Sequence, residues 1–212
     1  MVRRTKEEAQ VTRHRILDMA EQEFHRRGVS RTSLQDIARA AGLTRGAIYW
    51  HFKDKADLFN EMMLRVTLPL EQEIKRSGDP GLEDPLGQIR RSFLAALRST
   101  VADPQARRIF EIALHKVEYV EELQGVRDRR LKGLQERLVQ LERGFRRARP
   151  RGAARSTVSA RAAALGLHSL VDGLIQNWML DPQVFDLMRV GKQVIDVYLK
   201  GLQDSPPSPP QG

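Results

Sequence analysis

The side chains best suited to recognise another molecule are concentrated in one short stretch, TRGAIYWHFKDK, from Thr44 to Lys55. Arg45 can donate paired hydrogen bonds to the edge of a guanine, and Lys55 can neutralise a phosphate. Tyr49, Trp50 and Phe52 stand between these charges and have the apolar area of core residues. A short helix cannot bury both sets, so the set left outside is a candidate surface for binding a polyanion.

The spacing of apolar residues predicts helices along nearly the whole chain, and no stretch alternates with a period of two. Glycine, proline and candidate N-cap residues mark the helix ends. Thr32 is the expected cap of the second helix, with Gln35 three residues on, as in a capping box. Thr44 is expected to cap the third helix and Asp54 the fourth. The predicted helices cover about 6–27, 33–41, 45–52, 55–75, 86–102, 105–114, 117–148, 156–180 and 184–202.

These elements predict an all-α protein of about nine helices in two parts. Residues 1–55 form an N-terminal three-helix domain, and residues 56–203 form a larger helical domain. Residues 204–212 are a proline-rich tail that we expect to be disordered or extended.

The second and third predicted helices are joined by residues 42–44, a tight turn that contains a glycine, as in a helix-turn-helix. The second helix of that motif lies in the major groove of DNA, with its N-terminal residues against the base edges. Thr44, Arg45, Gly46 and Ala47 occupy that position. Ile48 and Phe52 are four residues apart and are expected to face inward. Tyr49, His51 and Lys55 are left to contact phosphates.

The start of the second helix offers further phosphate contacts from Thr32 and Ser33, since helix N-termini favour anions. Arg3, Arg4 and Lys6 add a basic arm. Residues 1–55 hold 12 Lys and Arg against 7 Asp and Glu, a net charge of +5 out of +9 for the chain. The alternative remains open at this point: aromatic residues at helical spacing often form a core, and a charged helix face is often only solvated.

Rival functions find less support in the sequence. No phosphate-cradling glycine loop, HExxH motif or nucleophile elbow is present, so we expect neither an enzyme nor a cofactor. The five histidines show no metal-ligand spacing, and the chain has no cysteine. A membrane-surface protein or a helical adaptor would not explain why the basic and aromatic residues converge on one helix-turn-helix. No apolar run is long enough to span a membrane or to act as a signal peptide, so we expect a cytoplasmic protein.

The stretches TSLQDIARAAGLTRG and TRGAIYWHFKDKADLF resemble the DNA-binding domain of TetR-family repressors. Further stretches, EIALHKVEYV and VDGLIQNWML among them, resemble the AcrR/TtgR branch, which represses multidrug efflux pumps. The resemblance covers most of the chain up to about residue 200. It implies that Thr44, Arg45, Tyr49, Trp50, His51 and Lys55 fall on the segment that contacts operator DNA. It also implies a repressor that a hydrophobic ligand releases from its operator. Regulation of a metabolic operon that encodes no efflux pump is the alternative.

The resemblance further implies a ligand cavity among the middle helices and a homodimer through the last two helices. Both of these last helices are apolar around most of their circumference, as expected of helices that are covered on several sides. A wholly internal core is the alternative. Polar groups at four-residue steps on one apolar helix suit the pocket, although a satisfied buried network would look the same. The expected pocket residues are Phe93, Leu97, Ile109, Phe110, Ala113, Leu114, Val117, His168, Val171, Asp172, Ile175 and Gln176.

Overall fold

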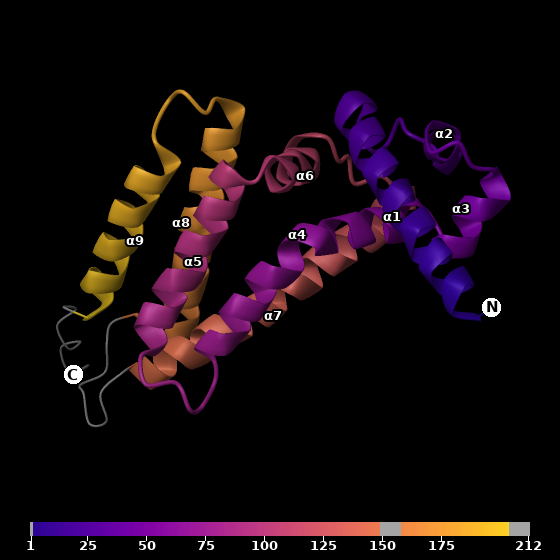
Figure 1. Cartoon of the computed structure of the whole chain (residues 1–212). Coiled ribbons are helices and arrows are strands. Elements are labelled where there is room, and N and C mark those ends of the chain that lie inside the picture. The colour runs from indigo at the N-terminus through magenta and orange to yellow at the C-terminus, as the bar shows by residue number, and fades with distance from the viewer. Residues whose placement is uncertain (1, 149–157, 204–212) are drawn as a thin grey trace. The chain divides into compact units, whose positions relative to one another are not determined.

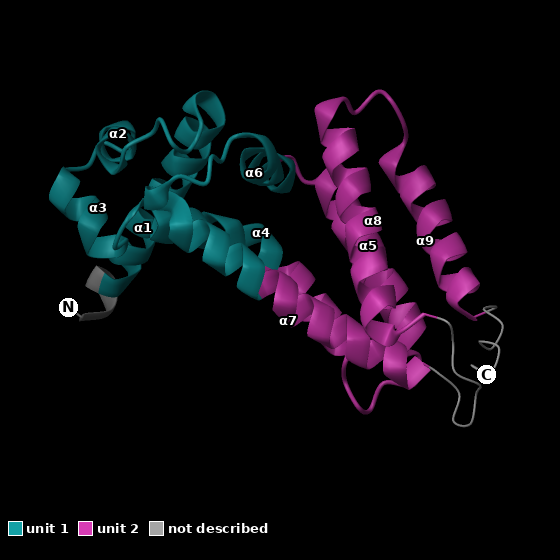
Figure 2. Cartoon of the chain, turned by 180° about the vertical axis from the view of Figure 1, so that it is seen from behind, with its two compact units in different colours: residues 1–67, 105–132 teal, residues 68–104, 133–212 magenta. Residues whose placement is uncertain are grey.

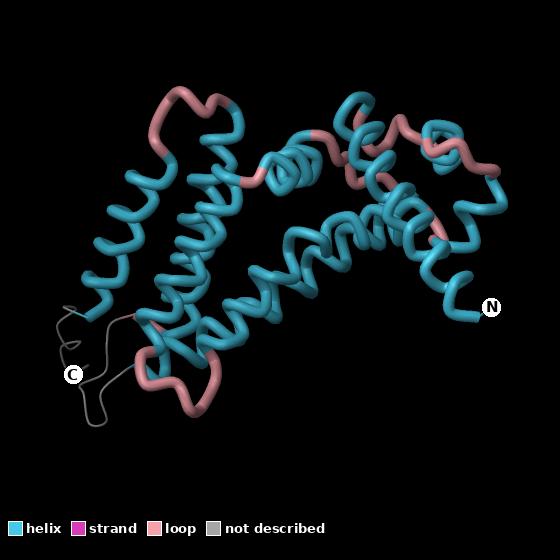
Figure 3. Tube along the Cα trace, viewed as in Figure 1, coloured by secondary structure: helices cyan, strands magenta, loops and turns pink. Residues whose placement is uncertain are grey.

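The structure is a computed structural model that describes residues 2–148 and 158–203, with side chains from residue 6 onward. The described residues form helices joined by loops and turns, and none of them lies in a strand (Figures 1 and 3), so the all-α prediction is confirmed. The predicted tail and the side chains of Arg3 and Arg4 lie outside the described part. The elements are α1 (Val2–Arg27), α2 (Leu34–Ala40), α3 (Arg45–His51), α4 (Lys55–Ser77), α5 (Pro85–Ala102), α6 (Pro104–His115), the 3₁₀ turn η1 (Glu121–Leu123), α7 (Gln124–Ala148), α8 (Ala160–Leu180) and α9 (Leu187–Gln203).

The chain forms two compact units, shown in different colours in Figure 2. Unit 1 comprises residues 1–67 and 105–132, and unit 2 comprises residues 68–104 and 133–212. Helices α4 and α7 therefore contribute residues to both units. Unit 1 is larger than the predicted N-terminal domain, because α6, η1 and the start of α7 belong to it. The functional boundary at residue 55 stays a prediction.

Unit 1 is organised around the apolar stripes of its first three helices. Ile16 and Phe24 of α1, Ile37 of α2 and Ile48 of α3 are fully buried in one cluster, together with Phe52. Burying side chains of this size contributes about 1.5–3 kcal/mol each. The inward orientation predicted for Ile48 and Phe52 is thus confirmed, and it fixes which face of α3 remains outside.

The start of α2 differs from the prediction by one residue. Ser33, and not Thr32, is the N-cap, and its Oγ accepts the N–H of Asp36 at 3.1 Å. Asp36 in turn accepts the N–H of Ser33 at 3.1 Å, so the capping box uses Asp36 and not Gln35. Two acceptors three residues apart satisfy two N–H groups that a helix end leaves open. The predicted cap, Thr32 with Gln35, is therefore wrong by one position, because Ser33 and Asp36 have the same spacing.

Gly42 ends α2 in the way that a helix-turn-helix requires. Its φ of +64° is left-handed, a conformation that favours glycine. The N–H of Leu43 donates to the carbonyl of Ala38 at 2.9 Å, and that of Gly42 to the carbonyl of Arg39 at 3.0 Å. This pair of bonds is a Schellman motif, which reverses the chain immediately after a helix.

The long helix predicted from residue 117 to 148 is interrupted at its start. Helix α6 ends at His115, residues 116–120 are extended or bent, and η1 precedes α7, which begins at Gln124. The later helices also begin a few residues after the predicted positions. Ser159 caps α8 by accepting the N–H of Ala162 at 3.1 Å, and Asp186 accepts the N–H of Arg189 at 2.9 Å before α9. Local caps, rather than the apolar pattern, set these boundaries.

Unit 2 packs α5, α8 and α9 against one another (Figure 2). Gly191 of α9 lies directly on Leu97 of α5, so that a larger residue there would clash. Arg90 of α5 donates to both carboxylate oxygens of Asp196 of α9, at 2.6 and 3.1 Å. The two helices are therefore joined by packing and by a bidentate ion pair.

Two possible features are absent from the described residues. No helix among them is long and apolar enough to cross a membrane. Within the same ranges, no three His, Asp or Glu side chains are grouped so that they could hold a metal ion.

Candidate DNA-binding surface

Helices α2 and α3, with the turn between them, form a helix-turn-helix beside α1 (Figure 1). Thr44 begins α3 as its N-cap, since its Oγ1 accepts the N–H of Ala47 at 3.2 Å. The guanidinium of Arg15, from α1, donates to the carbonyl of Ala41 and so supports the turn from outside. The N-terminus of α3 is therefore fixed by the turn, the cap and the buried Ile48.

The face of α3 opposite Ile48 is open to solvent. Thr44, Arg45 and Gly46 are exposed at its N-terminus, and Ala47 is half-buried. Tyr49 is 46% exposed and Trp50 is 74% exposed. Such exposed aromatic area is unusual on a helix this short, and it lies beside the residues that were predicted to address bases.

Arg45 and Tyr49 form a pair along this open face. The guanidinium carbon of Arg45 lies 5.5 Å from the centre of the Tyr49 ring, one turn further along the helix. A cation over an aromatic face is stabilised by about 0.5–1 kcal/mol at an exposed site. The pair limits the motion of the arginine, so less entropy would be lost if the guanidinium bound another group. This pair was not predicted from the sequence, although the four-residue spacing is its signal.

His51 closes α3 and is half-buried. Its ring meets the Trp50 ring edge-on, with centroids 4.6 Å apart. Burial lowers the pKa of His51 below its usual value, and the nearby positive charge of Arg13 lowers it further. His51 is consequently neutral at pH 7 and could contact a phosphate only as an N–H donor.

The two residues predicted at the start of α2 have different surroundings. Thr32 is buried, and its hydroxyl donates to the carbonyl of Gly28 at 2.8 Å. Its side chain is therefore committed to the turn after α1 and does not reach the surface as predicted. Ser33 is exposed, although its hydroxyl is engaged with Asp36 at 2.6 Å in the capping box.

Lys55 is placed differently from the prediction. Its side chain is only 3% exposed, and its ammonium lies 2.8 Å from a carboxylate oxygen of Glu122. The same ammonium donates to the carbonyls of Ser30 and Thr32, at 3.2 and 3.1 Å. All three N–H bonds are thus used inside unit 1, and in this conformation Lys55 supports the loop before α2 instead of meeting a phosphate.

Lys53, in the turn after α3, was not among the predicted contacts. Its side chain is exposed, whereas its backbone N–H donates to Asp57 at 3.0 Å. Asp54 caps α4 as predicted, by accepting the N–H of Asp57 at 2.8 Å. The cap holds the turn in place, and the Lys53 ammonium, which has no bonded partner among the described residues, lies beside the end of α3.

The predicted ligand residues are divided between the two units. Ile109 is fully buried in the core of unit 1, with Phe110, Ala113 and Val117 packed around that core, and Leu114 is half-buried. In unit 2, Phe93, Leu97 and Val171 are buried core residues and Ile175 packs against them. His168, Asp172 and Gln176 are half-buried on α8, where the amide of Gln176 donates to the Asp172 carboxylate at 2.6 Å. Their role in ligand binding stays a prediction.

A helix-turn-helix whose second helix, α3, has an open face is the mark of a DNA-binding protein of the helix-turn-helix class. Residues 16–62 match the family model for bacterial regulatory proteins of the tetR family. Residues 84–204 match the C-terminal region of MAATS-type transcriptional repressors. The chain belongs to the TetR family of transcriptional regulators, and it is not an enzyme.

Three relatives show how far the similarity extends. The regulator TtgR of Pseudomonas putida is 38% identical over 97% of this chain and 98% of its own. NalD is the secondary repressor of the MexAB-OprM multidrug efflux pump in Pseudomonas aeruginosa. Its crystal structure has a sequence that is 38% identical to this chain. It covers 92% of this chain and 96% of its own, with a TM-score of 0.83. SmeT, the repressor of the Stenotrophomonas maltophilia pump SmeDEF, was solved with triclosan. That complex is 32% identical and covers 95% of this chain and 100% of its own, with a TM-score of 0.81.

Proposed function

We propose that this protein is a homodimeric repressor of a multidrug efflux pump operon, released from its operator by a hydrophobic small molecule. It would act in the cytoplasm, where the operator lies. The observation that carries the DNA-binding part is the exposed Arg45–Tyr49 pair at the N-terminus of α3. The efflux part is supported by NalD and SmeT, both of which are named as repressors of such pumps.

The proposed contacts with DNA divide by chemistry. Arg45 reads a guanine in the major groove, with Gly46 and Ala47 keeping the surface low enough for close approach. Tyr49, His51 and Lys53 contact the phosphates on either side, with Trp50 beside them. The first N–H groups of α2, directly after Ser33, provide another phosphate contact. Lys55 and Thr32 stabilise this surface through their hydrogen bonds to the backbone of residues 28–32.

A single helix-turn-helix binds DNA weakly, and a dimer reads two half-sites about one helical turn, ~34 Å, apart. Apolar side chains exposed on α8 and α9 are the candidate interface. Leu165 is 48% exposed on α8 and Val197 is 73% exposed on α9. Exposed apolar side chains on two neighbouring helices are typical of a surface that a second copy covers.

Release of the protein from its operator requires that the ligand bind two forms of the dimer with different affinities. The ligand must bind more tightly to a dimer whose α3 helices no longer match the half-site spacing. The half-buried Asp172 and Gln176 on the otherwise apolar α8 are the proposed polar contacts for that ligand. Triclosan is the first probe for this chain, because it is the ligand in the SmeT complex.

The test is to recover the operator directly. Genomic fragments from the source organism are captured on the full-length protein, sequenced, and released with triclosan. The proposal expects enrichment of a near-palindromic site upstream of a pump operon, and loss of that enrichment with the ligand. Enrichment upstream of a metabolic operon would support the alternative, and no enrichment of any site would refute operator binding.

A further inference from the structure

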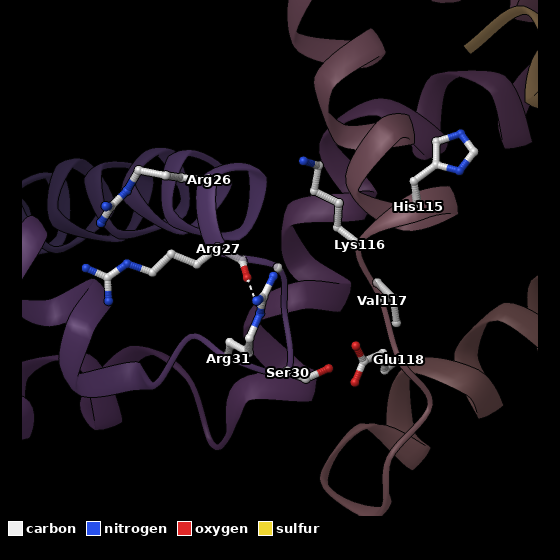
Figure 4. Close-up of a pocket in the computed structure, with 9 residues that line it drawn as sticks. Arg26, Arg27, Ser30, Arg31, His115, Lys116, Val117 and Glu118 are labelled. Carbon is white, nitrogen blue, oxygen red and sulfur yellow. Dashed lines mark hydrogen bonds between the residues drawn. The ribbon is translucent and has the colours of Figure 1, made fainter. Parts of the chain in front are cut away.

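Unit 1 contains a polar pocket that includes no residue of α3. It lies between the end of α1, the loop to α2 and the segment after α6 (Figure 4), with a volume of about 190 Å³. Four of its side chains are cationic and one is a carboxylate. The charged and hydroxyl groups that line it are Arg26, Arg27, Ser30, Arg31, Lys116 and Glu118.

Backbone contacts hold the two sides of this pocket together. The N–H of Val29 donates to the carbonyl of Lys116 at 2.9 Å. Gly28 has a φ of +84°, and a Cβ at that position would lie 3.6 Å from the same carbonyl. The loop from residue 28 to 33 is thus attached to the segment after α6 without any side chain between them. The pocket is therefore a built feature of unit 1.

Arg31 is positioned at the pocket by its own loop. Its Nε donates to the carbonyl of Arg27 at 2.9 Å, drawn as the dashed line in Figure 4. A Cβ at Gly28 would lie 3.8 Å from its Nη2. Among the described residues, no acceptor is bonded to its terminal nitrogens. The bond from Nε fixes the plane of the guanidinium. Its terminal N–H groups remain, and they are placed to donate to two oxygens of one anion.

Ser30 supplies a second, independent indication of a ligand. Its Oγ is buried, and it is the only such side-chain atom in the described ranges that has no hydrogen-bond partner. Buried hydroxyls without a partner are rare in proteins, and a bound water or ion is one explanation for such a group. In Figure 4 the Ser30 hydroxyl and the Glu118 carboxylate point toward one another at one end of the pocket.

We propose that this pocket binds a free phosphate group, either inorganic phosphate or a phosphate monoester. The terminal nitrogens of Arg31 donate to phosphate oxygens, and the P–OH of the singly charged form donates to Glu118. The Lys116 ammonium, which lies 3.6 Å from a carboxylate oxygen of Glu111, adds positive charge to the pocket. A monoester has a second pKa of about 6, so this form is present near neutral pH. Sulfate has no such proton at that pH, and neither does a DNA phosphodiester. The carboxylate thus selects a free phosphate against a backbone phosphate of the operator.

A bound phosphate would join the loop that carries the α2 cap to the segment after α6. A ligand that binds only the folded unit stabilises it in proportion to the logarithm of its concentration over its Kd. Of the residues predicted for the hydrophobic ligand, this pocket includes only Val117.

The proposal is tested by calorimetric titration of the full-length protein with inorganic phosphate or with sulfate. Both titrations are made at pH 7 and at equal ionic strength. One charged hydrogen bond corresponds to about a tenfold difference, so phosphate should bind at least about tenfold more tightly than sulfate. Glu118→Gln should bring the two affinities together. Arg31→Gln should weaken phosphate binding about tenfold, whereas Arg127→Gln, an exposed arginine outside the pocket, should leave it unchanged.

Dimethyl phosphate, a diester, distinguishes a site for free phosphate from a site for the backbone phosphates of DNA. The proposal expects no displacement of inorganic phosphate by this compound. Equal affinities for phosphate and sulfate in the wild-type protein would overturn it, as would competition by the diester. Glu118 is exposed, so its glutamine variant provides the test even if Arg31→Gln fails to fold, which circular dichroism would show.

Discussion

The ammonium of Lys55 lies 2.8 Å from the carboxylate of Glu122, across 67 positions of sequence, and it also binds the carbonyls of Ser30 and Thr32. One buried lysine thus connects the start of α4, the loop before α2 and the 3₁₀ turn before α7. A buried ammonium is tolerated only where such partners replace water. This relationship makes Lys55 a support for the helix-turn-helix.

Substitution of Lys55 by methionine should therefore destabilise the protein. The change leaves the buried carbonyl of Thr32 and the partly buried carbonyl of Ser30 without this donor, at about 1–3 kcal/mol each, partly offset by the lost cost of burying the charge. We expect the free energy of unfolding in urea to fall by about 2 kcal/mol. Glu122→Gln should cost less than about 1 kcal/mol, because Glu122 is 60% exposed and screened by solvent.

Lys53→Met is the matched control for that experiment. Lys53 is exposed, so its loss should leave the urea transition unchanged. It should instead weaken binding to all DNA sequences and reduce the salt slope by about one. If Lys55→Met proved as stable as the wild-type protein, the supporting role would be wrong.

The depressed pKa of His51 predicts a pH dependence of stability. In the unfolded chain the histidine has a pKa of about 6.5 and binds its proton first as the pH falls. Below that pH the unfolded state holds more protons than the folded state, so stability decreases with falling pH. Urea transitions between pH 5.5 and 7.5 should show this decrease, and His51→Gln should reduce it. An unchanged profile in the variant would assign the effect to other groups.

If the dimer forms through α8 and α9, a charge placed on the exposed apolar side chains of these helices should prevent dimerisation. Val197→Glu places a carboxylate on the apolar face proposed for the interface, where burial without a partner is costly. We expect the variant to sediment as a monomer at concentrations at which the wild-type protein is a dimer. Leu131→Glu is the control, since Leu131 is 46% exposed on α7, outside the proposed interface. Dimers of equal stability in both variants would contradict the proposed interface.

The Asp172 carboxylate on α8 predicts a change in ligand response without a change in DNA binding. Asp172→Asn removes the charge that would accept the phenolic O–H of triclosan and retains an acceptor for Gln176. The triclosan concentration for half-release from DNA should rise about tenfold, the effect of one charged hydrogen bond. Asn177→Ala, exposed on the same helix, should have no effect. Equal titrations for wild type and Asp172→Asn would remove this residue from the site.

The sequence predicted the features that depend on local periodicity. The four-residue spacing of Ile48 and Phe52 was sufficient to orient α3, and Gly42 was sufficient to place the turn. Thr32 was wrongly predicted as the cap in place of Ser33, because the two neighbouring residues have the same acceptor spacing. Lys55 was misplaced because its partner Glu122 is distant in sequence, and no local pattern reports a long-range ion pair. For the same reason the pocket at Arg31 and Lys116 was not foreseen.

Readout of bases by Arg45 is the central claim, and binding of full-length protein to its operator and to an unrelated duplex tests it most directly. Fluorescence anisotropy at fixed salt gives the ratio of the two affinities for wild type and for Arg45→Ala. The account predicts that Arg45→Ala loses about 1–3 kcal/mol of discrimination while binding unrelated DNA nearly as well as wild type. Discrimination by Arg45→Ala equal to that of the wild-type protein would contradict it.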